Sequence, residues 1–533
     1  AFNSTLSAPS SVSAVRASAA SEDPNADKYT FKYRVSCLNE DKSEESPASG
    51  VASVTANIYA YGTTVKITCS AVSGASFYRF YRCVGGLYGY IGDSEDTEIT
   101  DDNITPKTDI TIRRYDTVLG GGNNPRAVGY FEQRRVFAGL KNDPQRVLMT
   151  CTGTESQLTY SLPLRDDDRV SQRLATGQFN GIRHIVSLSQ LIILTTGQEV
   201  RVSPLNTDAI TPTSFASRLQ GSTGASAVTP LAIGNAVVYA AARGGHLYEL
   251  GYQYSSGGYV SNDLCLRSPH LFEFKTIKDS ALCKSPQQIM WFVSSDGSLL
   301  GCTYIPAEEV NAWHRHTTDG AFESIAAVAE GDEDYLYAVV RRTVDGKVRR
   351  YVERMSSQQL IDLEHAFHVD AGATYESETP VTTVSGFSWL EGKTVSILAD
   401  GAVCPQQVVK DGAITLEQPA KVVTVGLPYS SDAQTLPVYI DADSARGMGM
   451  QKNIERAALR VYSSSGIMAG PTFDELTEHK QRTTEQPGSA PKLVTGEIVL
   501  QLYTAWSESG QICIRQKDPL PLTIQSLSLS VSV

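Results

Sequence analysis

The chain has 533 residues, of which 46 are Lys or Arg and 58 are Asp or Glu, giving a formal net charge of −12. This acidity excludes a protein that holds nucleic acid through an overall basic field, and 41% hydrophobic with 20% charged residues excludes a disordered chain. A chain of this length is expected to form about three domains.

The composition also bears on compartment and secondary structure. The longest apolar run, residues 236–242, is too short for a spanning helix, which needs about 20 residues, so no stable membrane insertion is expected. No positively charged, apolar leader supports a signal peptide. Nine scattered cysteines without a C-x-x-C pair favour reduced thiols made in a cytosol. The many Gly, Pro and Tyr residues favour short strands over long helices.

The N-terminal part divides into an arm and a first domain. Residues 1–27 are rich in Ser and Ala without an apolar period, which predicts a flexible arm or linker. At residues 29–35 aromatic and apolar side chains alternate with polar ones, as on a strand. The segment "AVSGASFYRFYR" (71–82) adds a turn and an aromatic strand. Residues 28–112 are therefore predicted to form a β-sandwich that resembles a fibronectin type III domain.

A loose repeat covers residues 113–355. Strand openings stand 55, 46, 53 and 44 residues apart, near Ala127, Ile182, Val228, Ala281 and Ile325. A repeat of about 40–50 residues with three or four strands is typical of a β-propeller blade, because one blade cannot bury both faces of its small sheet alone. We therefore expect a propeller of about five to six blades, with Asp-Gly hairpin turns at 295–297 and 344–346.

A helical pattern and a second β-rich region complete the chain. Residues 356–379 are expected to be a helix-containing linker, capped by Ser356 or Ser357. Its expected apolar face comprises Leu360, Ile361, Leu363 and Phe367. Residues 380–533 are predicted to form a C-terminal β-rich domain with strands near 394–398, 422–425, 457–461 and 512–515 and a surface loop or short helix at 471–492. The predicted fold class is thus mainly β.

The segment from Gly386 to Thr394 looks like a phosphate-binding loop. It has five residues between its glycines where a Walker loop has four, and Trp389 and Leu390 stand where the backbone must wrap closely round a phosphate. No apolar strand leads into it. A strand-turn-strand is therefore predicted, and no cofactor is expected.

Two pairs of histidines share a face by their spacing. His314 and His316 lie on one side of an expected strand, close enough to share a metal, but no third ligand is evident. The alternative is a pair of packed or hydrogen-bonded histidines. His365 and His368 are three residues apart on the expected helix, where a helix face near an interface is the simpler interpretation. No metal site is predicted.

The acidic turn Arg165-Asp166-Asp167-Asp168-Arg169 has the carboxylates that glycosidic cleavage or a divalent ion needs. Three successive Asp side chains point in alternate directions, so we expect a solvated turn paired with its flanking Arg residues. Basic runs at 134–135 and 341–354 indicate rim or interface charges. G-x-S-x-G, H-E-x-x-H and EF-hand patterns are absent, and the sequence indicates no catalytic residue.

Several longer segments form a set. They include "RAVGYFEQRRVFAGLKNDPQ" (126–145), "LIILTTGQEVRVS" (191–203), "GNAVVYAAARGGHLYELGY" (234–252), "SPHLF" (268–272), "SDGSLLGCTYIPAEEVNAWHRHTTDG" (295–320), "YAVVRRTVDGKVRRYVERM" (337–355), "LEGKTVSILADGAV" (390–403) and "IRQKDPLPLTI" (514–524). In this order, from about residue 30 onward, they resemble the tail nozzle proteins of short-tailed bacteriophages, also called tail tubular B-like, hub or stabilisation proteins. Val200 departs from the Trp of those relatives, which bears on propeller packing.

The resemblance implies a structural virion protein and no enzyme. It implies a β-propeller with a C-terminal platform or nozzle domain, assembled as a homohexameric ring below the tail adaptor, or head-to-tail connector. Viral double-stranded DNA would be retained by this ring and leave through it, and tail fibres or tailspikes would attach to its sides. The expected location is the phage tail, after assembly in the bacterial host cytoplasm. The resemblance assigns no channel or gate residue.

Two other functions are open at this point. One is a glycan-degrading tail enzyme built on a propeller, with Asp166, Asp167, Asp168 and Glu155 as its candidate acids. The other is a host-binding adhesin, suggested by the sandwich at residues 28–112. For the conduit, an acidic or neutral lumen is expected, because a basic wall would retain each passing phosphate.

Overall fold

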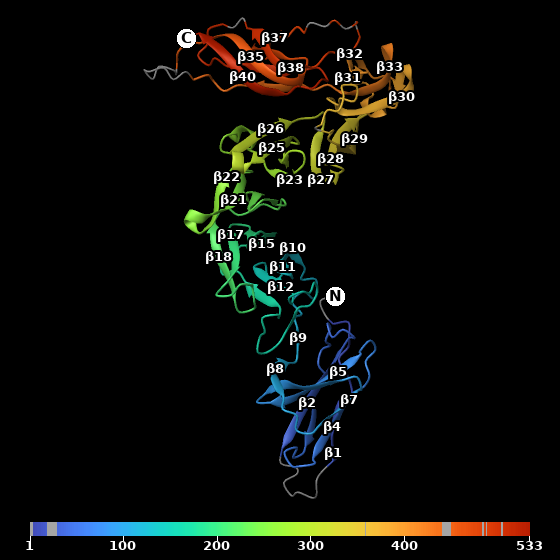
Figure 1. Cartoon of the computed structure of the whole chain (residues 1–533), viewed down its shortest axis with the longest axis vertical. Helices are drawn as coiled ribbons and strands as arrows, with labels where there is room; N and C mark the ends of the chain where they lie inside the picture. The colour runs from blue at the N-terminus through green and yellow to red at the C-terminus, as the bar shows by residue number, and fades with distance from the viewer. Residues whose placement is uncertain are drawn as a thin grey trace. The chain divides into compact units, whose positions relative to one another are not determined.

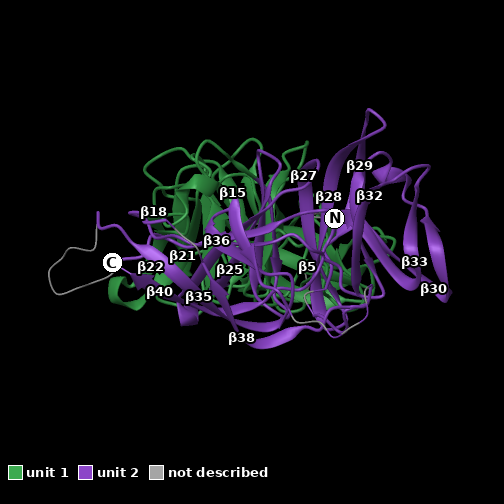
Figure 2. Cartoon of the chain, turned by 90° about the horizontal axis from the view of Figure 1, so that it is seen from above, with its two compact units in different colours: residues 1–277 green, residues 278–533 purple. Residues whose placement is uncertain are grey.

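The computed structural model describes residues 4–18, 29–357, 359–439, 449–481, 484, 486, 488–502 and 505–532. Two compact units divide the chain at residue 277 (Figure 2). Over the described ranges the regular elements are strands and short 3-10 turns, without an α-helix, so the expectation of a mainly β protein is confirmed. In the same ranges, no helix is long and apolar enough to span a membrane.

The first unit begins with two antiparallel sheets, in the orders β1-β4-β7 and β3-β2-β5-β6-β8 (Figure 1). Their strands are β1 (Ser13–Ser18), β2 (Thr30–Leu38), β3 (Ala52–Thr55), β4 (Thr64–Thr68), β5 (Phe77–Val84), β6 (Leu87–Ser94), β7 (Glu98–Asp101) and β8 (Lys107–Thr111). One core holds side chains of both sheets, including Tyr33 and Ile67. Of the residues predicted to alternate on one face, Phe31, Tyr33 and Val35 are buried and Tyr29 is exposed.

The N-terminal segment is not a free arm over its described part. β1 pairs antiparallel with β4, and Leu6 is buried against the sandwich core. The prediction of a flexible arm at residues 1–27 is therefore wrong for residues 4–18, and residues 1–3 and 19–27 lie outside the described part of the chain. Edge pairing uses only the backbone N–H and C=O groups, so a composition of Ser and Ala did not reveal the strand.

Three four-stranded antiparallel sheets follow in the first unit. The first contains β10 (Pro125–Phe131), β11 (Arg134–Leu140), β12 (Arg146–Met149) and β14 (Val170–Arg173). The second contains β15 (Ile182–Ser187), β16 (Leu191–Thr195), β17 (Glu199–Pro204) and β18 (Phe215–Gly221). The third contains β19 (Leu231–Ile233), β20 (Ala236–Ala240), β21 (Leu247–Gln253) and β22 (Gly258–Asp263). The short strands β9 (Arg114–Tyr115) and β13 (Thr159–Tyr160) form a separate two-stranded antiparallel sheet.

These three sheets pack on one another through apolar faces. Ile193 of β16 belongs to the core shared with the first sheet, and its neighbours Ile192 and Leu194 belong to the core shared with the third. A strand buried on both faces reads as a continuous apolar run, which is how β16 appears in the sequence. Val200 stands where the tail nozzle proteins that the chain resembles have Trp. It is 1% exposed and belongs to the core shared by the first and second of these sheets.

The second unit contains two more such sheets. One is the four-stranded sheet of β23 (Ile277–Cys283), β24 (Ile289–Ser294), β25 (Leu299–Ile305) and β26 (Val310–His316). The other has three strands, β27 (Ala321–Glu330), β28 (Glu333–Val344) and β29 (Lys347–Arg354). They share a core that includes Trp291 and Val340. All five strand openings predicted from the spacing lie in or just before the first strand of a sheet, and both Asp-Gly turns join hairpin strands, so these predictions are confirmed.

The helix expected within residues 356–379 is wrong. Residue 358 lies outside the described part; the others form a turn and coil up to β30 (Asp370–Ser385). Ile361 is 91% exposed, so the four apolar residues do not form one buried face, without which a short helix is marginal. The Asp362 carboxylate instead accepts the His365 N–H at 2.9 Å and closes a local turn.

Three sheets form the rest of the second unit. The first has the order β30-β33-β31-β32, with β31 (Thr394–Ala399), β32 (Ala402–Val408) and β33 (Ala413–Leu427). The second is β34 (Ser431–Gln434), β39 (Cys513–Gln516), β36 (Met468–Thr472) and β37 (Glu475–Glu478); the third is β38 (Val494–Gln501), β35 (Asn453–Ser464) and β40 (Ile524–Ser532). Three of the four predicted strands fall within observed ones, and the fourth, 512–515, overlaps β39, which begins one residue later. The boundary at residue 380 falls inside β30, and the loop predicted at 471–492 contains β37.

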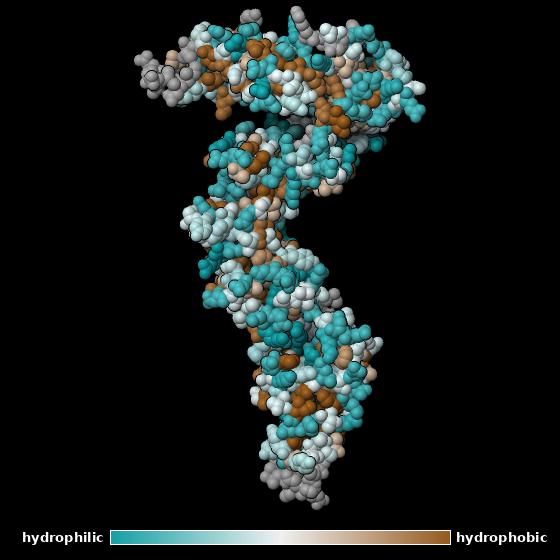
Figure 3. Space-filling model, viewed as in Figure 1, coloured by the Kyte–Doolittle hydropathy of each residue, from teal (hydrophilic) through white to brown (hydrophobic). Residues whose placement is uncertain are grey.

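Surface hydropathy follows from this construction. On the face drawn in Figure 3, hydrophilic residues cover most of the surface, and hydrophobic ones form patches along the sheets. Individual large apolar side chains are exposed on strands at sheet edges, among them Val128 and Tyr130 on β10 and Val348 and Val352 on β29. An apolar edge strand is a site where another chain can pair, because its outer backbone groups are free.

Candidate functional site

The turn with three successive Asp residues is built around one buried carboxylate. Asp168 is 0% exposed, and its Oδ2 accepts hydrogen bonds from the Ser161 hydroxyl (2.6 Å), the Ser161 N–H (2.9 Å) and the Arg165 N–H (2.9 Å). Asp167 instead pairs with Arg165 (3.3 Å) and Arg113 (3.5 Å). The carboxylates diverge, as predicted. The expectation of a solvated turn is wrong for Asp168, because three protein donors replace water around it.

A buried arginine fixes the same turn through its backbone. Arg134 is 2% exposed and donates from Nη1 to the carbonyl oxygens of Thr150 and Asp168, both at 2.7 Å, and from Nη2 to that of Asp166 at 2.6 Å. The fork of the guanidinium matches a set of converging carbonyls. Arg134 was expected to be a rim or interface charge; it is a buried structural donor that holds the turn against β11.

The acids considered for glycan cleavage are engaged separately. Glu155 forms an ion pair with Arg135, whose guanidinium also lies over the Tyr130 ring. A glycosidase needs two carboxyl groups about 5–10 Å apart that both face the sugar. Here Asp168 is enclosed, while Asp167 and Glu155 each pair with their own arginines. The arrangement gives Asp168 a structural use and gives Asp167 and Glu155 separate ion pairs.

His314 and His316 lie side by side on β26, as predicted. His314 Nδ1 and His316 Nε2 are 2.8 Å apart, so one ring donates a hydrogen bond and the other accepts it. Both rings contact Trp291, and Gly301 opposite His314 gives that ring its space, since a Cβ there would lie 2.1 Å from His314 Cε1. In the described part of the chain, no third His, Cys, Asp or Glu joins the pair in a metal-binding group.

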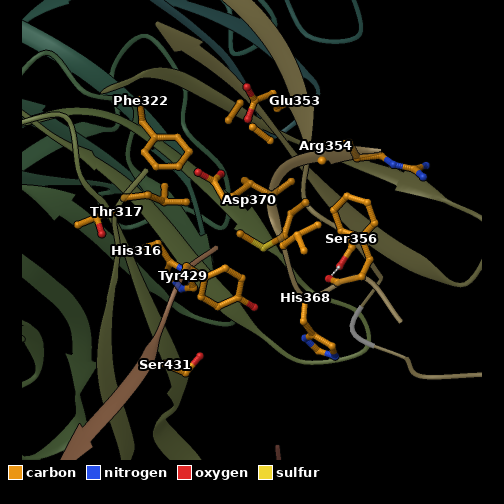
Figure 4. Close-up of a pocket in the computed structure, with 18 of the residues that line it drawn as sticks. His316, Thr317, Phe322, Glu353, Arg354, Ser356, His368, Asp370, Tyr429 and Ser431 are labelled. Carbon is orange, nitrogen blue, oxygen red and sulfur yellow. Dashed lines mark hydrogen bonds between the residues drawn. The ribbon is translucent and has the colours of Figure 1, made fainter. Parts of the chain in front are cut away.

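These histidines line a pocket of about 1030 Å³ in the second unit (Figure 4). It lies among β26, the sheet β27–β29, the start of β30 and the segment before β34. Burial lowers the pKa of His314, and burial together with the His314 charge lowers the pKa of His316 to about 4. Burial also lowers the pKa of His368 in the pocket wall. At neutral pH these imidazoles are therefore uncharged and offer hydrogen bonds, while the charges in the pocket wall come from other side chains such as Arg354 and Asp370.

A charged network closes one side of this pocket. Arg342 of β28 is 5% exposed and makes a two-pronged contact with Glu353 of β29 (2.6 and 2.7 Å). It also donates to Asp370 at the start of β30 (3.2 Å) and to the Asp319 carbonyl (3.0 Å). The Thr318 hydroxyl adds a 2.6 Å hydrogen bond to Asp370. Arg342 was expected to be a rim or interface charge; it is buried and ties the three-stranded sheet to the following one.

The remaining predicted positions are separated. His365 is exposed and pairs with Asp362 (2.7 Å), which raises the pKa of His365, whereas His368 faces the pocket, so these two histidines do not share a face. The segment from Gly386 to Thr394 is a strand-turn-strand, as predicted, with the 3-10 turn Ser388–Leu390 between β30 and β31. Its Lys393 pairs with Asp319 at 2.7 Å.

One group of potential ligands was not recognised in the sequence. His246, Asp263 and Cys265 bring an imidazole nitrogen, a carboxylate oxygen and a thiol within 4.8 Å of one another at the end of the β21–β22 hairpin. His246 Nδ1 lies 2.8 Å from Asp263 Oδ2, Asp263 Oδ1 accepts the Cys265 N–H at 2.8 Å, and Cys265 is 0% exposed. Their spacing in the sequence follows no metal motif; only the strand register aligns them. All nine cysteines of the chain have free thiols.

Comparisons with known proteins give only distant similarities. No protein-family model and no curated protein matches the chain. Among solved structures it is similar to a protein from Lactobacillus plantarum, with 10% identity, a TM-score of 0.28, and 61% of this chain and 96% of that one covered. It is also similar to a luciferin-regenerating enzyme, with 8% identity, a TM-score of 0.26, and 59% of this chain and 95% of that one covered. For Raptor from Chaetomium thermophilum the identity is 12% and the TM-score 0.25, with 57% of this chain and 28% of that one covered. Similarities this weak carry no argument on function.

Proposed function

We propose that this chain is a structural component of a short phage tail, a nozzle or hub protein whose copies form a ring. The observation that carries the proposal is where the resembling segments fall. "RAVGYFEQRRVFAGLKNDPQ" supplies most of the hairpin β10–β11 and "YAVVRRTVDGKVRRYVERM" most of the hairpin β28–β29, and the segment at 295–320 contains β25 and β26. The resemblance therefore follows the repeated unit of the fold and is not confined to one local motif.

The finer architecture is part of the same proposal. The five sheets from β10 to β29 are taken as blades of a β-propeller, because successive sheets share apolar cores within each unit. The two sheets at β1–β8 are taken as a fibronectin type III-like sandwich, and the sheets from β30 to β40 as the platform or nozzle domain. Rigid sheets offer flat surfaces for the head-to-tail contacts of a homohexamer without a moving active site.

Charge supports a conduit. A net charge of −12 is compatible with a lumen through which double-stranded DNA slides, because a wall with few cations would not hold its phosphates. Two of the conspicuous arginines, Arg134 and Arg342, are buried and serve internal hydrogen bonds, so they are unavailable to DNA. The proposed lumen is net negative or mixed. The ring would sit on the adaptor, hold the genome until triggered and carry fibres or tailspikes on its sides.

The deciding experiment is an electron-microscopic reconstruction of the chain assembled on its tail adaptor. We expect a six-fold ring with an axial hole about as wide as duplex DNA and a wall that is net negative or mixed. A monomer before the adaptor is added is compatible with this expectation. A trimeric fibre that binds host cells, or a lumen dominated by Lys and Arg, would contradict the proposal. Release of reducing sugar from host polysaccharide, abolished by Asp→Ala changes at 166–168, would favour the enzyme instead.

A further inference from the structure

The three-stranded sheet β27–β29 ends in an open edge. In the other four blade-like sheets a fourth strand follows the third, as β26 follows β25, whereas within the described residues nothing pairs with the outer side of β29. β29 has eight residues, so the edge is long for a globular protein. Proteins usually shorten, cover or pair such an edge, because its free backbone groups attract other strands.

The strand register identifies the free groups. Met355 N–H donates to the Leu336 carbonyl at 2.8 Å, and the register pairs Arg354 with Tyr337. Because hydrogen-bonded pairs alternate along an antiparallel ladder, the odd-numbered residues of β29 bond to β28 and the even-numbered ones direct their N–H and C=O outward. The outward residues are Val348, Arg350, Val352 and Arg354.

The side chains at this edge favour a particular kind of strand. Val348 and Val352 are 59% and 74% exposed, although valine is typical of a covered strand. Arg350 and Arg354 already pair with Glu323 and Glu330. Lys347 and Arg349 have no ion pair with a described residue. A strand with alternating apolar and acidic side chains would cover the valines and pair with the free cations across the new ladder.

There is room beside the edge. The pocket of about 1030 Å³ is lined by Tyr351, Val352, Glu353 and Arg354 of β29 and, from β26, by His314 and His316. Figure 4 shows Glu353 and Arg354 on one side of it and His316 on another. This volume is at the upper limit of small-molecule sites, about 300–1,000 Å³, and suits a peptide.

We propose that the open edge of β29 is completed by an extended, alternately acidic and apolar segment of another protein, which adds to the sheet as its fourth strand. Main-chain hydrogen bonds would supply the affinity, and the cations and valines of β29 the selectivity. This inference deepens the docking role proposed above and rests on that role only for the partner's place in the tail.

The test uses the full chain and a labelled eight-residue peptide of alternating Val and Glu, followed by fluorescence anisotropy. Val352→Pro removes an outward N–H and keeps the β28–β29 ladder, since proline is tolerated at an edge where the N–H faces outward. We expect it to weaken binding by about tenfold or more. Val352→Thr keeps the N–H and is the matched control, with binding within about twofold.

A second variant guards against local misfolding. The double variant Lys347→Glu, Arg349→Glu leaves the backbone intact. We expect it to bind the Val-Glu peptide more weakly than the wild-type chain does, and to bind a Val-Lys peptide more tightly. Three results would overturn the proposal. The wild-type chain could bind both peptides equally or bind neither, or Val352→Pro could bind the Val-Glu peptide as tightly as the wild-type chain does. Self-association of the chain that Val352→Pro abolishes would assign the edge to a second copy and also overturn it. Ring formation on the adaptor is scored separately, so either proposal can fail alone.

Discussion

Two buried arginines in this protein are neutralised by carboxylates in different surroundings. In the N-terminal sandwich Arg82 is 4% exposed, and its partner Asp101, 2.8 Å away, is 0% exposed. In the sheet β27–β29 Arg342 is 5% exposed, but the side chains of its partners Glu353 and Asp370 are 27% and 23% exposed. Water is excluded from the first network and reaches the second through the pocket.

This difference separates two uses of the same chemistry. A fully enclosed pair leaves an uncompensated buried charge when one partner is lost, which is costly, whereas a carboxylate that still touches water is rehydrated. The sandwich network therefore acts as an internal brace. The Arg342 network joins two sheets beside an accessible space, where its carboxylates can meet an incoming group.

The enclosed network gives the largest expected effect. The Asp101 carboxylate accepts hydrogen bonds from the Tyr33 hydroxyl (2.8 Å), Arg82, and the N–H groups of Asn103 (3.0 Å) and Ile104 (2.9 Å). Asp101→Ala should lower the free energy of unfolding of the sandwich by about 3–5 kcal/mol. Hydrogen exchange of peptides from β2, β4 and β5 measures this change.

The adjacent residue provides the control for that variant. Asp102 is exposed, and Asp102→Ala should change the same exchange by no more than about 0.5 kcal/mol. Equal effects of the two variants would show that burial does not distinguish these carboxylates.

A smaller loss is expected at the open network. Arg342→Gln should destabilise the sheets β27–β29 and β30–β33 by about 1–3 kcal/mol, because Glu353 and Asp370 remain partly hydrated after the guanidinium is removed. Urea unfolding of Arg342→Gln, Glu353→Gln and the double variant forms a cycle whose coupling energy measures the pair. A loss as large as that of Asp101→Ala would contradict the distinction between the two networks.

The pocket also predicts a pH response of the region around the Arg342 network. The pKa of His316 falls from the ordinary 6.5 to about 4 on folding. Below about pH 6.5 the unfolded chain therefore binds a proton at His316 that the folded chain does not bind. The free energy of unfolding then decreases as the pH falls toward 4. His316→Gln should reduce the drop in urea midpoint between pH 7 and pH 5.

The control for this titration is a pocket residue that does not titrate. Thr317→Ala should leave the pH dependence unchanged, because Thr317 lines the same pocket and carries no titratable group. If His316→Gln and the wild-type chain lose stability equally on acidification, the imidazole pair is not the source of the response.

The smallest effect on stability is expected at the ion pairs around Glu323, on the outer face of the sheet β27–β29. Glu323 bridges Arg341 and Arg350 at 3.4 and 2.5 Å, but all three side chains are solvated. Glu323→Gln should not change the urea midpoint measurably, because exposed ion pairs contribute little. A clear shift would show that charges on this face belong to a more protected network.

The elements that the sequence revealed are those with local signals. The Asp-Gly turns and the spacing of strand openings located the sheets from β10 to β29, because each sheet is made of neighbours in the chain. Residues 4–18 were missed, since β1 pairs with a strand about fifty residues away and shows no strong pattern of its own. The helix expected near Leu360 failed because helical spacing alone does not ensure a surface that buries it.

The site was predictable only in part, for a similar reason. The shared face of His314 and His316 follows from strand period and needed no tertiary information. The burial of Asp168 depends on Ser161 and Arg165 folding round it, and the Arg342 network joins residues from three strands. Such convergence depends on register and packing, which one sequence read locally does not contain.

The neighbour-to-neighbour pairing of β10 to β29 has a consequence for biosynthesis. Each of these sheets closes soon after its last strand leaves the ribosome, because its strands are joined by short connections and need no distant partner. The C-terminal sheets differ, because they contain strands that pair with much later segments of the chain. β34 pairs with β39, and β35 pairs with β40. Synthesis therefore leaves β34 and β35 without these partners until β39 and β40 have been made, whereas the sheets from β10 to β29 have their partners close by in the chain.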